Sequence, residues 1–408
     1  MLVHWIWLAT RPNISDRIKR ELIDRFHEPE DIFYAEAEDY QILPELTETI
    51  CQSLMDKKLD KAWDIIEKCK QKAIHILTYQ DAAYPSRLKN ISDPPMVLYY
   101  KGRLPDFDAQ PFIGVVGTRG ATAYGITAAK KMGYQIACCG GALVSGAAEG
   151  IDAASMSGAL TGNGTVVGVL GCGADIVYPA VNRPLFADLT RYGCLISEFV
   201  PGTPPYGWNF PKRNRIISGL SNGVLVVEAP KKSGSLITAE LALEQGRDVF
   251  VIPGNIDSPN SAGSNALLRD GAMAVSCGWD MVGEYESLFP GKLRPSEQPG
   301  LAAMTENMEP MVAETVEKPG LKKEKSVTDN KKTIDKGQKP PYSDVEKKLP
   351  ELNEQEQRIV NELKQGERLT DDVIAATGIP AGQMLGVLTM LEIKGVISRL
   401  PGNRIALK

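Results

Sequence analysis

Six apolar runs, each followed by a helical pattern, constrain the fold of this chain more than any other feature of its sequence. They are Phe112–Val116, Ala142–Val144, Val166–Leu170, Cys194–Ile196, Val224–Val227 and Val249–Ile252. Strands that are buried on both faces read as continuous apolar runs, and alternation with helices is typical of a parallel sheet covered on both sides. We therefore predict an α/β domain with a doubly wound parallel sheet over residues 81–288.

The segments on either side of this domain differ from it in composition. Residues 1–80 contain the amphipathic stretches Ser15–Phe26 and Asp56–Lys72, which predict a small helical domain. The opening Met1–Leu8 lacks the basic start and the cleavage site of a secretory signal, so we expect a packed helix there. Residues 289–350 are rich in Lys, Glu, Pro and Thr. Such a segment buries too little apolar surface to fold, and we expect a disordered linker.

The last segment, residues 351–408, is periodic again. Three helical patterns and two short strands follow one another: Asn353–Lys364, Thr370–Thr377, Pro380–Lys394, Val396–Leu400 and Arg404–Leu407. This order predicts a winged helix. The third helix carries a cation only at Lys394, whereas its other central residues are mostly apolar: Gln383, Met384, Leu385, Val387 and Leu388. Because winged helices that read DNA usually present a basic recognition helix, we expect core packing or protein contact here.

Charge and residue content exclude several kinds of protein. The formal net charge of -5 argues against a protein that coats nucleic acid indiscriminately, so such binding would require a local cationic patch. No apolar run is long enough to cross a bilayer, and we expect a cytoplasmic protein with no membrane partner. The seven cysteines are scattered, and the histidines His4, His27 and His75 precede the expected sheet domain. We expect no cofactor and no metal site.

Small residues follow the expected strands at the edge where ligands of such sheets bind. The turns are Gly117-Thr118-Arg119-Gly120, Ser145-Gly146-Ala147-Ala148-Glu149-Gly150, Gly171-Cys172-Gly173, Ser233-Gly234-Ser235 and Pro253-Gly254. Small residues allow the backbone to approach a ligand closely, and exposed amides at helix starts favour an anion. Any one of these is compatible with an ordinary tight turn. Together they favour an anion-binding edge.

The run Trp208–Leu220 places cations at the mouth of the same sheet. Its cations are Lys212, Arg213 and Arg215, and its aromatic rings are Trp208 and Phe210. Arginine offers a rigid fork of donors that fits phosphate oxygens, lysine adds a point charge, and an aromatic ring offers a face on which an unpaired base stacks. We expect this run to be a basic loop. For the three cations alone, a solvated surface loop is the simpler interpretation.

Common nucleotide-binding motifs are absent from the sequence. Gly168, Gly171 and Gly173 have the wrong spacing for a dinucleotide fingerprint, and no P-loop pattern occurs. The conceivable acids or bases of the sheet domain are Glu149, Asp152, Glu198, Glu228 and Glu240. We expect Asp152 and Glu240 in the first turns of helices, where a negative charge complements the helix dipole.

The motifs between about Ile74 and Val282 resemble those of the DNA-processing protein A family, also called Smf. They are Asp93-Pro94-Pro95, Leu98-Tyr99, Gly117-Thr118-Arg119, Ser145-Gly146, Gly150-Ile151-Asp152, Tyr178-Pro179, Asn182, Ser197-Glu198, Phe210-Pro211, Arg213-Asn214-Arg215-Ile216-Ile217, Ser233-Gly234-Ser235-Leu236-Ile237-Thr238, Gly246-Arg247, Pro253-Gly254 and Gly271-Ala272. The resemblance implies an extended Rossmann-like domain that binds single-stranded DNA and forms a homodimer. It also implies that the protein shields incoming strands, loads the recombinase RecA during natural transformation, and is not an enzyme.

The flanking segments fit the same family. The N-terminal helices resemble the sterile-alpha-motif-like or helix-hairpin-helix module of many members, and residues 351–408 resemble their C-terminal winged helix. The chain departs from the family's pattern at Glu149, Met156 and Ala180. By the resemblance, these changes remove positive charge from the expected groove, so we expect either weaker binding or a greater dependence on Lys212, Arg213 and Arg215.

Two functions of different kinds remain open from the sequence. In the first, single-stranded DNA lies along the glycine-rich edge and contacts Gly117, Arg119, Ser145, Gly146, Phe210, Lys212, Arg213, Asn214, Arg215, Gly234 and Ser235. In the second, the chain resembles the Rossmann-like nucleotide phosphoribohydrolases and cleaves nucleoside monophosphates at the same anion site. Their glycine turn corresponds best to Ser233–Glu240, where Ser233 replaces the first glycine. This poor match favours the DNA-binding hypothesis.

Overall fold

The computed structural model describes two compact units, which meet in the sequence at Ala313 and Glu314. The described residues are 1–40, 46–295, 354–364, 366–379, 384, 387–388, 391, 396–400 and 404–407. None of the helices in these residues combines the length and the apolar character that a bilayer crossing requires.

Within residues 46–295, nine strands form one sheet in the order β1-β2-β6-β5-β4-β3-β7-β8-β9. The strands are β1 (His75–Thr78), β2 (Val97–Gly102), β3 (Phe112–Val116), β4 (Ala142–Ser145), β5 (Val166–Leu170), β6 (Cys194–Ser197), β7 (Gly223–Val226), β8 (Asp248–Val251) and β9 (Met273–Ala274). Neighbouring strands from β6 to β9 are parallel. At the other edge, β2 pairs antiparallel with both β1 and β6.

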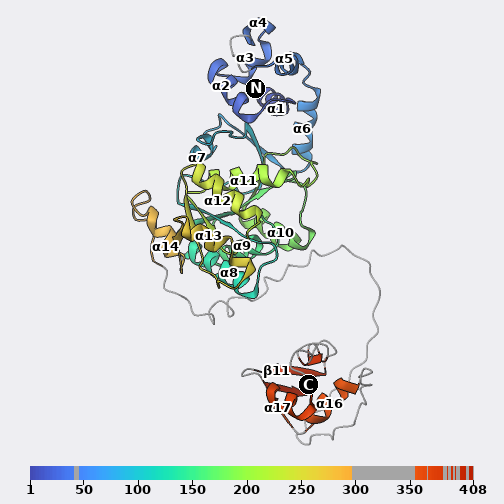
Figure 1. The fold of residues 1–408 in the computed structure, drawn as a ribbon. Coiled ribbons are helices and arrows are strands. Elements are labelled where there is room, and N and C mark those ends of the chain that lie inside the picture. The colour runs from blue at the N-terminus through green and yellow to red at the C-terminus, as the bar shows by residue number, and fades with distance from the viewer. Residues whose placement is uncertain are drawn as a thin grey trace, which may run out of the picture. The chain divides into compact units, whose positions relative to one another are not determined.

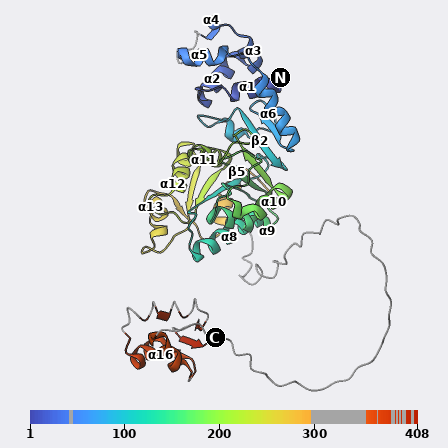
Figure 2. The ribbon, with the colours of Figure 1, turned by 90° about the vertical axis from the view of Figure 1, so that its right-hand side faces the viewer.

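Helices cover both faces of the sheet (Figure 1 and Figure 2). Successive side chains of a strand point to opposite faces, so Ile113 and Val115 of β3 join one core while Phe112 and Val116 join the other. The first core includes residues of α8 (Ala123–Cys138), α9 (Ile151–Thr161), α10 (Arg183–Tyr192) and α14 (Trp279–Val282). The second includes residues of α7 (Ser86–Lys89), α11 (Asn209–Leu220), α12 (Gly234–Glu244) and α13 (Ser264–Arg269). Short 3-10 turns are η1 (Ala180–Asn182), η2 (Pro259–Ser261) and η3 (Gly283–Tyr285).

Two glycines allow α8 and α9 to pack closely. A Cβ on Gly133 would lie 2.0 Å from the carbonyl oxygen of Ser155, and a Cβ on Gly158 would lie 2.0 Å from that of Lys130. Any larger residue at either position would push the two helices apart. Because both helices follow turns at the carboxyl edge of the sheet, this packing also fixes the spacing of those turns.

The N-terminal helices form their own apolar cluster against the edge of the sheet. They are α1 (Leu2–Ala9), α2 (Asp16–Phe26), α3 (Pro29–Tyr34), α4 (Ala37–Tyr40), α5 (Glu48–Met55) and α6 (Asp60–Gln71). Trp7 is fully buried in this cluster, which also contains Val97 and Tyr99 of β2. The predicted packed helix at the start of the chain is confirmed, and Ser15 caps α2 by accepting from the Ile18 N–H group.

All six predicted strands are present, each to within one residue at either end. Strands β1, β2 and β9 are not among them. β1 falls inside residues 1–80, where a separate helical domain is expected, and it carries His75 into the sheet. The expectation that every histidine precedes the sheet is therefore wrong. His75 is exposed at the far edge and stacks on Tyr100, with ring centroids 5.0 Å apart.

The run Trp208–Leu220, expected as a basic loop, is the helix α11 with its N-cap residue. Ile216, Ile217 and Leu220 pack into the second core and hold the helix against the sheet. Residues 212–215 are all polar or charged, so the apolar stripe that predicts a helix appears only at its end.

Part of the expected linker belongs to the folded unit. Phe289 and Leu293 are each 8% exposed and join the first core, and the Arg294 N–H group donates to the Cys139 carbonyl oxygen at 3.2 Å. The linker prediction is wrong for residues 289–295 because two apolar side chains attach this stretch to the core. Its remainder, residues 296–350, lies outside the described residues.

The second unit contains α16 (Glu354–Leu363) and α17 (Thr370–Thr377). Among its described residues, three strands pair in the order β10 (Arg368–Leu369), β12 (Arg404–Leu407) and β11 (Ile397–Leu400). Two predicted helices and both wing strands are confirmed. The predicted third helix lies largely outside the described residues, but Met384 and Leu388 are buried in the apolar cluster of this unit. Their burial supports the prediction of core packing.

Candidate functional site

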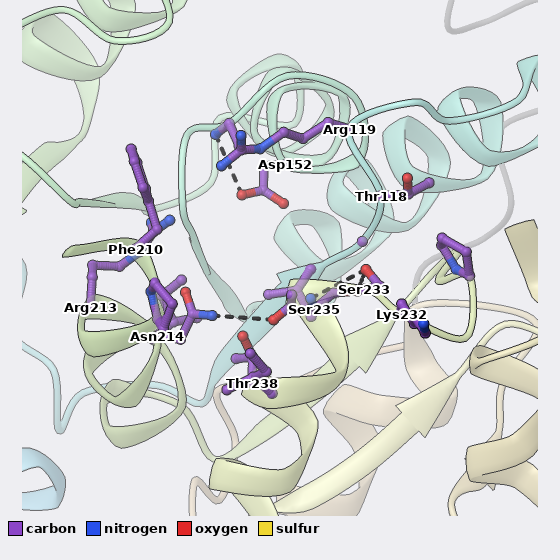
Figure 3. Close-up of a pocket in the computed structure, with 18 residues that line it drawn as sticks. Thr118, Arg119, Asp152, Phe210, Arg213, Asn214, Lys232, Ser233, Ser235 and Thr238 are labelled. Atoms are coloured by element: carbon purple, nitrogen blue, oxygen red, sulfur yellow. Dashed lines mark hydrogen bonds between the residues drawn. The ribbon is translucent and has the colours of Figure 1, made fainter. Parts of the chain in front are cut away.

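A groove opens at the topological switch point of the sheet. β3 and β7 are neighbours in the sheet. The next strand after β3 in the chain, β4, lies on one side of this pair, and the next strand after β7, β8, lies on the other side. Ligands of open α/β sheets bind where the loops after two such strands diverge. The groove has a volume of about 320 Å³ (Figure 3). It is lined by Val116, Gly117, Thr118, Arg119, Ala148, Asp152, Phe210, Pro211, Arg213, Asn214, Ile217, Pro230, Lys232, Ser233, Gly234, Ser235, Ile237 and Thr238.

Two exposed cations line the groove, Arg119 from the turn after β3 and Lys232 from the turn after β7. The guanidinium carbon of Arg119 lies 5.3 Å from the centroid of the Phe210 ring, within the range of a cation–π contact. Within the described parts of the chain, neither cation forms an ion pair. Both positive charges are therefore available to an anionic ligand.

The N-terminus of α12 points at the same groove. Ser233 is its N-cap residue, and the Ser233 hydroxyl accepts from the Ser235 N–H group at 3.3 Å. The side-chain amide of Asn214 donates to the Gly234 carbonyl oxygen at 3.2 Å and so connects α11 to this turn. The first N–H groups of a helix have no intrahelical acceptor, and the helix dipole adds partial positive charge there. This end of the groove is suited to a phosphate group.

Phe210 supplies an aromatic surface beside these charges. Its ring packs on Gly171, where a Cβ atom would lie 2.8 Å from the Phe210 Cδ1 atom. On another side, the ring of Tyr178 lies with its centroid 5.6 Å from that of Phe210. Contacts with Gly171, Tyr178 and Arg119 therefore fix the orientation of the Phe210 ring.

Arg213 lines the groove but is only 4% exposed. Its Nη1 atom donates to the Val169 carbonyl oxygen, and the guanidinium packs on Gly146. Burial lowers the pKa of Arg213 to about 10, and the nearby carboxylate of Asp152 opposes that shift. Arg213 was expected to hold a phosphate, whereas in this structure it connects the ends of β4 and β5.

Arg215 and Lys212 belong to an ion-pair cluster outside the groove. The Arg215 guanidinium donates to Glu198 and Asp93 at 2.8 Å and to Asp16 at 2.9 Å. The Lys212 Nζ atom lies 3.4 Å from Glu198 and 3.6 Å from Asp16. Burial would lower the pKa of Arg215, but its three carboxylate partners outweigh burial and raise that pKa. Because Asp16 comes from α2, the cluster joins the N-terminal helices to α11.

The carboxylates nearest the groove are already bound by the protein itself. Asp152 accepts from the N–H groups of Gly146 at 3.1 Å and Ala148 at 3.4 Å, and burial raises its pKa. Glu228 accepts from the Thr122 N–H group at 2.9 Å and from its hydroxyl at 2.6 Å. Both carboxylates therefore hold turns in place.

Two carboxylates, Asp152 and Glu240, are predicted in the first turns of helices. Asp152 lies in the first turn of α9 as predicted, whereas Glu240 lies beyond the first turn of α12, so that prediction is wrong. Because α12 begins at Gly234, Glu240 is the seventh residue of the helix.

In the described part of the chain, no group of three or more His, Cys, Asp or Glu side chains is arranged to hold a metal ion.

The structure gathers most of the predicted site residues at one groove. Those that line it are Gly117, Arg119, Phe210, Arg213, Asn214, Gly234 and Ser235. Those outside its lining are Ser145, Gly146, Lys212 and Arg215. The Ser145 hydroxyl donates to the Val115 carbonyl oxygen at 2.6 Å, and the Gly146 amide, expected to hold a phosphate, donates to Asp152 instead. Both groups are buried and serve internal contacts.

Lys232 and Thr238 line the groove although neither is in the predicted set. A signal for Lys232 exists in the sequence, because the pair Lys231-Lys232 directly precedes the small-residue turn at Ser233. No sequence pattern indicates Asp16, since it lies in a different domain from the arginine that it contacts.

The part of the chain that contains the groove matches a known family. Residues 75–286 match the family described as DNA recombination-mediator protein A, and residues 344–403 match the DprA winged helix domain. The chain belongs to the DNA recombination-mediator protein A family. The resemblance stated from the motifs is therefore confirmed, as are the Rossmann-like sheet domain and the winged helix.

This member of the DNA recombination-mediator protein A family aligns with its relatives over long stretches. Protein Smf of Synechocystis sp. is 34% identical over 356 residues, which cover 84% of this chain and 82% of the relative. DNA processing protein DprA of Bacillus subtilis is 40% identical over 224 residues, or 55% of this chain and 74% of the relative. The X-ray structure of DNA processing protein A from Streptococcus pneumoniae has a TM-score of 0.62 and 31% identity. It covers 70% of this chain and 98% of that chain.

Two of the three departures from the DNA recombination-mediator protein A pattern lie at the surface. Glu149 and Ala180 are exposed, whereas Met156 is fully buried in the first core beneath the sheet. The expectation that all three changes remove charge from the groove is therefore wrong for Met156, because its side chain has no access to the groove.

Proposed function

We propose that this protein binds single-stranded DNA in the groove between the turns after β3 and β7. In this proposal, phosphates contact Arg119, Lys232, the Gly234 N–H group and the Ser235 hydroxyl at the start of α12. A base stacks on the ring of Phe210. Gly117 and Asn214 shape the turns that bring these groups together.

The observation that carries the proposal is that Arg119, Lys232, the N-terminus of α12 and the ring of Phe210 line one groove, with Arg119 in contact with the ring. Cations that form no ion pair within the described residues and the partial positive charge of a helix N-terminus attract phosphate. An aromatic face binds any unpaired base, because every base has a π-face. In a duplex the bases are already stacked and paired, so only the phosphate contacts would remain.

The other predicted contacts take supporting roles. Arg213, Ser145 and Gly146 hold the ends of β4 and β5, which support the groove from below. Arg215 anchors α11 to the N-terminal helices. Lys212 is half-exposed and adds a positive charge near the DNA, which its neighbours Glu198 and Asp16 weaken.

Membership in a recombination-mediator family supports a wider role. We infer that the protein shields incoming single strands during natural transformation and loads RecA onto them, that it acts as a homodimer in the cytoplasm, and that it works by binding rather than catalysis. The internal contacts of Asp152 and Glu228 agree with this inference, because each carboxylate has a structural role in holding a turn.

A competition experiment tests the DNA preference. Fluorescence anisotropy with a labelled oligodeoxythymidine, competed with unlabelled single-stranded, duplex and RNA oligonucleotides of equal length, should give the tightest binding to single-stranded DNA. Binding should vary little with base sequence and should decline strongly with salt. Equal affinity for duplex DNA in the same buffer would contradict the proposal.

Separate assays test the wider role. The protein should shorten the lag of RecA filament formation on single strands already coated with a single-strand-binding protein, and sedimentation should give the mass of a dimer. Incubation with nucleoside monophosphates should release no free base. Base release at a rate proportional to enzyme concentration would instead support the phosphoribohydrolase hypothesis.

A further inference from the structure

Two exposed aromatic rings lie at the start of α11, outside the lining of the groove. Tyr206 and Trp208 stack with ring centroids 4.7 Å apart and an interplanar angle of 9°. Trp208 is 72% exposed and Tyr206 is 45% exposed. We call these two residues the aromatic platform. Two nearly parallel rings give a flat apolar face, and a flat face suits a planar ligand.

Hydrogen bonds fix the aromatic platform to the carboxyl edge of the sheet. The side-chain amide of Asn209 donates to the Gly171 carbonyl oxygen at 3.0 Å and to that of Pro204 at 3.4 Å. The Asn209 N–H group donates to the Tyr206 carbonyl oxygen at 3.0 Å. The segment that carries both rings is therefore attached to the end of β5.

The aromatic platform lies close to the groove in the chain. Trp208 is the N-cap residue of α11, and Phe210 follows it by two positions, so their Cα atoms lie at most about 7 Å apart. The surroundings of the platform are open, because a Cβ on Gly207 or Gly202 would meet no atom within 4 Å.

We propose that Tyr206 and Trp208 form a second base-stacking subsite for single-stranded DNA. This inference rests on the proposed function of the neighbouring groove. A flexible single strand held by its phosphates at Arg119 can place one base on Phe210 and a following base on the platform. Stacking on aromatic rings tolerates any base, which agrees with binding of low sequence selectivity.

The test separates base stacking from phosphate contact. Affinity of the full chain is measured by fluorescence anisotropy for an oligodeoxythymidine and for an abasic oligonucleotide of the same length. Trp208→Ala should weaken binding to oligodeoxythymidine about tenfold and leave binding to the abasic strand unchanged. Trp208→Phe keeps an aromatic face and should restore most of the affinity. Trp63→Ala, at a tryptophan of α6 that is 55% exposed, should change neither value.

Several outcomes would overturn the inference. Equal affinity of Trp208→Ala and the wild-type chain for oligodeoxythymidine would do so, and so would an equal loss on both strands, since an abasic strand cannot stack. A changed sedimentation mass for Trp208→Ala would make the aromatic platform a contact between protein chains. If the wild-type chain binds neither oligonucleotide, the proposed function itself fails.

Discussion

The Arg215 guanidinium donates to the Glu198 carboxylate at 2.8 Å, and both side chains are only 5% exposed. Asp93 and Asp16 bind the same guanidinium, so three segments that are distant in the sequence meet at one cation. A buried guanidinium depends on its carboxylate partners, because loss of a partner leaves charge uncompensated away from water. The cluster thus makes Arg215 a structural residue of this fold.

Replacement of Arg215 tests that role. Arg215→Ala should lower the free energy of unfolding by about 3 kcal/mol, since Glu198 and Asp16 lose their closest cation and keep only lysines as partners. Urea unfolding of the wild type, Arg215→Ala and Arg191→Ala measures the effect. Arg191 is exposed at the end of α10, and its loss should change stability by no more than about 0.5 kcal/mol. Wild-type stability of Arg215→Ala together with a large loss of DNA affinity would show instead that Arg215 contacts phosphate.

The same cluster predicts a pH dependence of stability. Burial alone would raise the pKa of Asp16, but Lys19, Lys212 and Arg215 hold it below the usual value of 3.8. A carboxyl group whose pKa is depressed in the folded state stabilises the fold above its unfolded pKa. That contribution disappears as the pH falls through the folded pKa.

Stability should therefore decline below about pH 4, and Asp16→Asn should decline less over the same range because it has no proton to take up. Urea unfolding at several values between about pH 6 and pH 3 gives both curves. Asp24→Asn, at an exposed carboxylate of the same helix, is the matched control. Parallel curves for the wild type and Asp16→Asn would contradict this role of Asp16.

The contribution of the C-terminal unit is testable by truncation. The cut belongs after Pro295, because Phe289 and Leu293 are part of the core and a shorter fragment would lose them. The truncated chain should bind single-stranded DNA nearly as tightly as the full chain, since the groove lies wholly in the first unit. Titration of both chains with one oligonucleotide decides the matter. A loss of tenfold or more, about 1.4 kcal/mol, would make the winged helix a second DNA contact.

The central strands were predictable from the sequence for a physical reason. Strands such as β3 and β5 are buried on both faces, so their apolar runs stand out from the helices between them. β1 and β2 lie at an antiparallel edge and β9 has two residues, and segments of this kind leave weak patterns. The turns after the strands likewise predict where the groove lies, because topology places them at one edge.

The separate roles of the arginines could not be predicted in this way. Arg119, Arg213 and Arg215 carry the same side chain, and sequence spacing does not report which of them is exposed. The buried guanidinium of Arg215 donates to Asp16, which lies 199 positions earlier in the chain. Its environment depends on how the N-terminal helices pack, and only the tertiary structure contains that information.

The measurement that tests the central claim most directly is the salt dependence of DNA binding by Arg119→Ala. If Arg119 contacts a phosphate, fewer counterions are released from the DNA when Arg119→Ala binds. The slope of log affinity against log salt concentration should therefore decrease in magnitude by about 0.7. Lys232→Ala should do the same. Arg103→Ala removes an exposed arginine that follows β2 at the opposite edge of the sheet and should leave the slope unchanged. Unchanged slopes and affinities for both Arg119→Ala and Lys232→Ala, with folded and stable proteins, would contradict the assignment of single-stranded DNA to this groove.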